Sequence, residues 1–126
     1  MPFVKINLAQ HLTDAVKKEI SLAVHESLME HFNIPPDDYF QVIHEIRPAD
    51  LLYPESYLNI PHTGSMVYIE ITARYGRTVA MKKALYHAIA ERIAARTLIS
   101  ANDVFIVLTE VTGENWSMGG GFAQMA

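Results

Sequence analysis

The chain of 126 residues has no cysteine, a single tryptophan and no long apolar run. The missing cysteine excludes disulfides, thiol nucleophiles and metal sites with thiolate ligands. No stretch approaches the roughly 18 uninterrupted apolar residues of a membrane-spanning helix. No cluster of Lys or Arg occurs, and a net charge of −4 gives no support to nucleic-acid binding. The amino end lacks the charged-then-apolar layout of a signal peptide, so we expect a cytoplasmic protein.

Half of the residues are apolar, which favours a chain with a packed core. Four segments have the alternation or β-branched composition of strands: residues 3–8, 39–46, 67–72 and 104–111. One amphipathic helical segment lies between the first and second of these strands, and another lies between the third and fourth. Thr13 and Thr78 are the expected N-caps of the two helices. The order predicts an α/β (α+β) fold in one domain, residues 1–126, with two β-α-β halves, about 1–47 and 65–112, and a glycine-rich tail. In the proline-containing link between the halves we expect a short extended piece or turn near Tyr57 and Leu58.

Strands joined by a crossover helix run parallel, and the crossover is almost always right-handed. Two such units form one four-stranded mixed sheet with both helices on one face. The second face then has no helix to cover it, although the link and the tail are an alternative cover. Its apolar residues predict an oligomer built on that face.

The second residue is proline. Removal of Met1, which a small second residue permits, leaves a secondary amine at the chain end. An α-amino group titrates at about pH 7.7–8.0, and burial or nearby cations lower its pKa. A general base works best when its pKa lies near the working pH, so Pro2 is a candidate base, acid or nucleophile. Alternatively, Pro2 only precedes an edge strand.

Two arginines, Arg74 and Arg77, flank the turn between the third strand and the second helix. Free backbone N–H groups and the helix dipole favour an anion there, and guanidinium groups suit carboxylates. Gly76 permits a turn that other residues resist. The segment therefore predicts a carboxylate clamp, unless both arginines are simply solvated.

Other candidates are less specific. Asp38 could orient water or hold the nitrogen of Pro2, but Asp after Pro is usually a turn residue, as we expect for Asp37. Trp116 and Phe122 could wall the site and exclude water, or pack on a neighbouring subunit. The six histidines show no spacing typical of a metal site, so no metal ligand is expected.

Together these residues resemble the tautomerase superfamily, most closely its malonate semialdehyde decarboxylase branch. The resemblance covers nearly the whole chain and rests on the order and spacing of several segments: Met1-Pro2, Ile34-Pro35 to Gln41, Gly76-Arg77-Thr78, Lys82 to Tyr86, Asp103-Val104 and Asn115-Trp116-Ser117.

The resemblance implies a cofactor-free enzyme and a homotrimer with sites near subunit boundaries. In tautomerases the amino-terminal proline shuttles a proton; in the decarboxylase and dehalogenase branches it stays protonated and acts as an acid. Carried onto this chain, the catalytic set is Pro2, Arg74, Arg77 and Asp38, and the residues expected to contact substrate are Arg74, Arg77, Trp116, Met118 and Phe122.

The chain departs from the decarboxylase pattern in the spacing of Arg74 and Arg77. Two residues separate them, as in the cis-3-chloroacrylic acid dehalogenase branch. In the decarboxylase pattern only one residue separates the two arginines. The water-activating histidine of that dehalogenase has no clear counterpart, however, and its tyrosine falls near Val107. Met118 replaces an aromatic residue.

Three functions follow as hypotheses. The first is a tautomerase acting on a small 2-oxo or enol carboxylate, with Pro2 as base. The second is decarboxylation or hydration of a 3-oxo acid, with cationic Pro2 assisted by Asp38. The third is a non-catalytic binding protein, as in the relative macrophage migration inhibitory factor.

Overall fold

The computed structural model describes residues 2–126, and Met1, with the expectation that it is removed, lies outside the described residues. The helices and strands are β1 (Phe3–Ala9), α1 (Asp14–Phe32), β2 (Gln41–Ile46), β3 (Ser56–Tyr57), β4 (Ile60–Pro61), β5 (Val67–Arg74), α2 (Val79–Arg96) and β6 (Val104–Val111). Three short 3₁₀ helices lie in the connections: η1 (Pro48–Asp50), η2 (Ala101–Asp103) and η3 (Gly113–Asn115).

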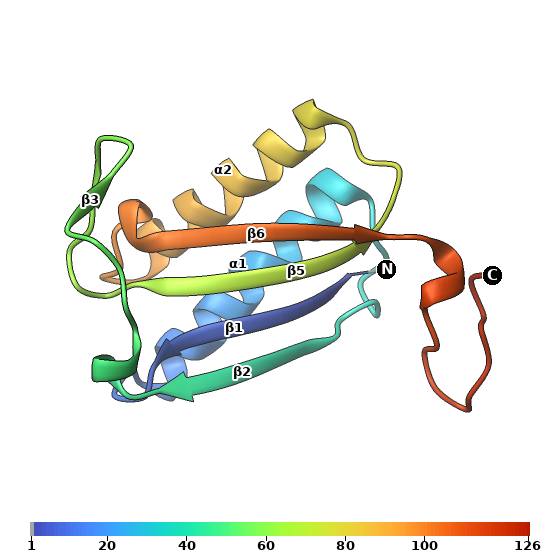
Figure 1. The fold of residues 1–126 in the computed structure, drawn as a ribbon, viewed down its shortest axis with the longest axis horizontal. Helices are drawn as coiled ribbons and strands as arrows, with labels where there is room; N and C mark the ends of the chain where they lie inside the picture. The colour runs from blue at the N-terminus through green and yellow to red at the C-terminus, as the bar shows by residue number, and fades with distance from the viewer. Residues whose placement is uncertain (1) are drawn as a thin grey trace.

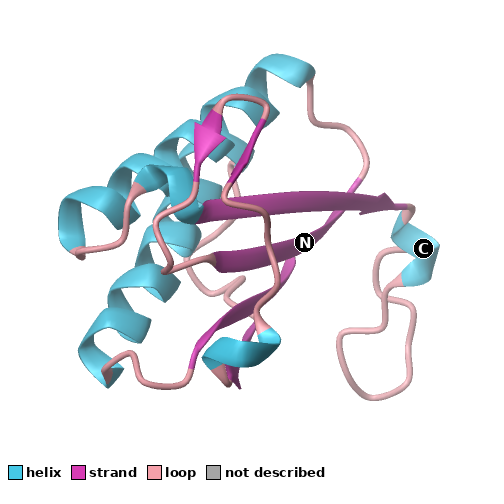
Figure 2. Ribbon diagram, turned by 60° about the vertical axis from the view of Figure 1, so that its left-hand side comes forward, coloured by secondary structure: helices cyan, strands magenta, loops and turns pink. Residues whose placement is uncertain are grey.

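The four long strands form one mixed sheet in the order β2-β1-β5-β6. β1 runs parallel to β2, and β5 runs parallel to β6, whereas the central β1–β5 pair is antiparallel. Both helices lie on the same face of this sheet (Figures 1 and 2). The predicted pair of β-α-β units is therefore confirmed.

The core lies between the helices and the sheet. Each helix buries one apolar stripe at intervals of three or four residues, because such residues share a helix face. The stripe of α1 includes Ile20, Val24 and Leu28, and that of α2 consists of Leu85, Ile89 and Ile93. The expected N-caps are confirmed: Thr13 accepts from Val16 N, and Thr78 accepts from Met81 N.

Four chain segments meet at one end of the sheet, on the right of Figure 1. β1 and β2 begin there, and β5 and β6 end there, since Phe3 pairs with Thr72 and Arg74 pairs with Val111. The start of β1 and the carboxyl-terminal tail lie at the same end (Figure 1). This topology brings the two ends of the sequence to the turn that precedes α2.

Some boundaries differ from the sequence expectation. β2 begins at Gln41, not at residue 39, because Asp38 N bonds to Pro35 O and the chain is still leaving that turn. β5 continues to Arg74, which is therefore a strand residue. In the link, Leu58 and Asn59 adopt positive φ between β3 and β4, which confirms the expected turn.

The sheet face opposite the helices carries exposed apolar side chains. Phe105 and Val107 of β6 are about half exposed, at 51% and 47%, and Val42 of β2 is 39% exposed. Within residues 2–126, no helix is long and apolar enough to cross a membrane.

Candidate active site

Pro2 is buried at the end of the sheet where the four segments meet. The backbone around it is fixed on the β2 side, where Val4 N bonds to Phe40 O at 3.0 Å. Continuing the β1–β5 register by one residue places Pro2 beside Ala73. A pocket of about 200 Å³ opens at this point, lined by Pro2, Phe3, Phe40, Trp116, Ser117 and Met118. Pro2, directly before β1, therefore lines a small, mainly apolar pocket.

Asp38 is buried, with 4% of its surface exposed, whereas the adjacent Asp37 is exposed. Two prolines restrict the chain before it, and the Asp38 N–H closes a turn onto Pro35 O at 3.1 Å. Burial raises the pKa of the Asp38 carboxyl, and the nearby Asp37 acts in the same direction. A positive charge on the amino terminus, on His25 or on Arg77 opposes that rise in pKa.

Arg77 occupies a fixed position at the start of α2. Its Nη1 donates to Arg74 O at 2.8 Å, and its Nη2 donates to Phe32 O at 3.4 Å. The guanidinium carbon also lies 4.9 Å from the centroid of the Phe32 ring, a cation–π contact. Burial lowers the pKa of Arg77, while Glu110 and Asp38 favour its charged form. Because arginine stays protonated in proteins, a partly buried positive charge sits beside the site.

Arg74 differs from Arg77 in exposure. It is the last residue of β5, and its side chain is exposed beside the tail. Its Nε lies 3.4 Å from the position that a Cβ on Gly113 would take. The turn after it depends on Gly76, whose φ of 125° disfavours any residue with a side chain.

The tail supplies two of the expected contact residues and leaves one outside. Trp116 and Met118 line the Pro2 pocket, whereas Phe122 does not line it and is 72% exposed. The tail loop is closed on itself by Gln124, which accepts from Met118 N and donates to Gly119 O. Trp116 Nε1 is buried and has no hydrogen-bond partner within residues 2–126.

The structure thus gathers most of the predicted set at one end of the sheet. Arg74 ends β5, and Arg74 and Asp38 both influence the pKa of Arg77, but none of the three residues lines the pocket of Pro2. Phe3, Phe40 and Ser117 also line the pocket, although none of them was predicted as a site residue. Two of them could have been found from strand register, because the first residues of parallel neighbouring strands lie side by side.

Three larger hollows, of about 390, 540 and 370 Å³, involve neither Pro2 nor the arginines. The first lies on the open sheet face, the second beside the β3–β4 region on the left of Figure 1, and the third between η3 and the end of the tail. No group of three or more His, Asp or Glu side chains in the described chain is placed to hold a metal ion. Because the buried Pro2 lines the smaller pocket, that pocket is the candidate site.

Comparison with known proteins gives consistent matches along the chain. Two family profiles, both described as tautomerase enzyme, match residues 38–119 and residues 2–56. The probable tautomerase YusQ of Bacillus subtilis (strain 168) is 40% identical, over 99% of this chain and 98% of its own. The structure of FG41 malonate semialdehyde decarboxylase inhibited by 3-bromopropiolate superposes with a TM-score of 0.91 at 32% identity, covering 97% of this chain and 92% of the other. A fused 4-OT symmetric trimer has the same fold, with a TM-score of 0.80 at 21% identity and coverage of 98% and 97%.

Proposed function

The chain belongs to the tautomerase family of enzymes, and on that premise we propose that it is a cofactor-independent isomerase of small 2-oxo or enol carboxylates. The base in this proposal is the nitrogen of Pro2, freed by removal of Met1. The observation that carries the proposal is the burial of Pro2 against a small, mainly apolar pocket, at the end of the sheet where β5 ends in Arg74.

In the proposed reaction Pro2 moves one proton within the substrate. Its nitrogen takes the proton from the enol hydroxyl and returns it to the neighbouring carbon, so that the C=C bond becomes C–C as the carbonyl forms. Arg77, with Arg74, holds the carboxylate and stabilises the negative charge that develops on the oxygen. The apolar side chains around Pro2 exclude water, which strengthens these charge interactions.

Turnover of phenylenolpyruvate tests this role. Pro2→Ala keeps an amino terminus but changes its basicity and geometry, so we expect kcat/KM to fall by at least about 10²-fold. Pro48→Ala, at the start of η1, is a matched control that should behave as wild type. Wild-type turnover by Pro2→Ala would reject the mechanism.

A second candidate is decarboxylation or hydration of a 3-oxo acid. It is supported by the burial of Asp38 and by the likeness to FG41 malonate semialdehyde decarboxylase. In that reaction the bond to the carboxyl carbon breaks, CO₂ leaves, and protonated Pro2 gives its proton to the resulting enolate. Titration of the Pro2 amine separates the candidates: a pKa near or below neutrality supports the base, and one well above neutrality supports the acid.

We propose that the enzyme is a homotrimer. The exposed apolar residues of the sheet face opposite the helices support this, and the fused 4-OT chain with the same fold is a symmetric trimer. Light scattering during size-exclusion chromatography should give about three times the 14.2 kDa of one chain. A mass of one chain would contradict the proposal.

A further inference from the structure

His25 is a buried histidine of α1 that lies under the turn carrying Asp38. It is 5% exposed, and its Nε2 lies 2.9 Å from the carbonyl oxygen of Pro36. A carbonyl oxygen can only accept, so the hydrogen must be on Nε2. The turn is therefore attached to α1 two residues before Asp38.

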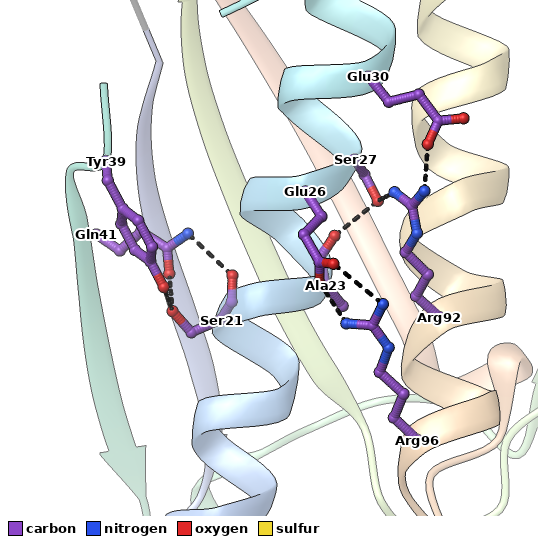
Figure 3. Close-up of polar contacts among 9 residues, drawn as sticks. All are labelled: Ser21, Ala23, Glu26, Ser27, Glu30, Tyr39, Gln41, Arg92 and Arg96. Atoms are coloured by element: carbon purple, nitrogen blue, oxygen red, sulfur yellow. Dashed lines mark hydrogen bonds and ion pairs between the residues drawn. The ribbon is translucent and has the colours of Figure 1, made fainter. Parts of the chain in front are cut away.

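A second attachment follows Asp38 directly. The ring of Tyr39 stacks on the imidazole of His25 with centroids 4.0 Å apart and an interplanar angle of 30°. The Tyr39 hydroxyl and Ser21 Oγ share a hydrogen bond of 2.5 Å. Ser21 also exchanges hydrogen bonds with Gln41, at 2.7 and 3.3 Å (Figure 3). Ser21 and His25 are four residues apart, so both act from one face of the helix.

Asp38 lies between these attachments, and both include His25. We propose that His25 is a positioning residue that holds Asp38 in its buried place at the candidate site. This proposal depends on the proposed function in one respect, which is that Asp38 takes part in the reaction. His25 does not line the pocket of Pro2, so its effect on catalysis passes through the aspartate.

Loss of a charge on His25 and release of the turn would change the pKa of Asp38 in opposite directions. A positive charge on His25 lowers the pKa of Asp38, so its loss would raise that pKa. Burial is the main cause of the raised pKa of Asp38, so release of the turn into water would lower it. Other charged groups act near Asp38 and His25. Asp37, Arg77 and the amino terminus influence Asp38, and Glu26 lies beside His25.

The test uses the full chain labelled with ¹³C at aspartate side chains. In His25→Phe the ring remains but the N–H donor is lost, whereas His25→Gln keeps an N–H donor. The carboxyl resonance of Asp38 should titrate at a lower pH in His25→Phe than in wild type, and close to wild type in His25→Gln. His87→Phe, at an exposed position of α2, is the control and should leave the titration unchanged. Should His25→Phe not fold, Ser21→Ala removes the hydrogen bond to Tyr39 from the second attachment and should shift the titration the same way.

An Asp38 pKa in His25→Phe that is equal to or higher than that of wild type would overturn the proposal. Turnover gives a second reading: kcat should fall about 10- to 100-fold in His25→Phe, with KM changed much less, and recover in His25→Gln. The titration does not need a substrate. A wild type inactive in every assay would reject the proposed function, while the titration would still decide the role of His25.

Discussion

Arg77 donates a hydrogen bond from Nη1 to the backbone carbonyl of Arg74, 2.8 Å away, across the turn that joins β5 to α2. Its second contact, to Phe32 O and the Phe32 ring, ties the same guanidinium to the end of α1. Arg74 contributes a backbone oxygen to this arrangement, while its own side chain is exposed. The two arginines are therefore unequal: the guanidinium of Arg77 is held by two carbonyl oxygens and an aromatic ring, whereas the side chain of Arg74 is exposed.

This inequality predicts unequal losses of activity. Arg77→Ala should lower kcat/KM by about 10²–10³-fold, because a preorganised donor to the developing oxyanion is lost. Arg74→Ala should have a smaller effect, mainly on KM. Arg47→Ala, which removes an exposed arginine paired with Asp50, is the control. Steady-state kinetics would contradict this account if Arg74→Ala were the more damaging of the two.

The turn itself depends on Gly76. A Cβ there would meet no atom within 4 Å, so the obstacle to a side chain is the φ of 125° and not a collision. Gly76→Ala should lower the free energy of unfolding by about 1–2 kcal/mol, measured by urea denaturation. Because the turn sets the position of Arg77, kcat/KM should fall as well. Unchanged stability in this variant would show that the turn tolerates a side chain.

The raised pKa of Asp38 predicts a pH-dependent change in stability. A carboxyl whose folded pKa is above its unfolded value of 3.8 favours folding below that value and loses this contribution as pH rises through the folded pKa. Asp38→Asn removes the buried ionisation, so it should be more stable than wild type at pH 7. The difference should shrink as pH falls toward 3.8. Thermal unfolding from pH 3 to pH 8 measures this, and a variant less stable than wild type at pH 7 would contradict the sign.

A second buried aspartate anchors the link between the halves. Asp103 is fully buried and accepts from Thr63 N, Thr63 Oγ1 and Ser65 N. Asp103→Ala should cost about 2–4 kcal/mol of unfolding free energy, because these donors lose their partner in a buried place. Asp50→Ala, at an exposed carboxylate paired with Arg47, should change it by less than about 0.5 kcal/mol. Equal effects of the two changes in urea denaturation would show that the link is not anchored in this way.

The elements could be predicted from sequence because each has a strong local signal. Thr13 and Thr78 cap the two helices as expected, and the parallel pairs β1–β2 and β5–β6 follow from the crossover helices. The predicted start of β2 at Tyr39 was wrong, because β propensity extends to Tyr39 while the turn closed by Asp38 delays pairing to Gln41.

The site was only partly predictable, because burial depends on tertiary contacts. Asp37 and Asp38 are the same residue type side by side, yet only Asp38 is buried. Trp116 and Phe122 were equivalent aromatic candidates, but the tail brings only Trp116 to Pro2. His25 has no recognisable motif, because its partners lie on the far side of a turn eleven residues away.

The central claim is that Pro2 carries a free, reactive amine in the apolar pocket. Mass spectrometry of the intact protein before and after treatment with 3-bromopropiolate, followed by peptide mapping, tests it most directly. We expect a chain that lacks Met1 and takes up one label, located on Pro2. A chain that retains Met1, or a label located on another residue, would contradict it.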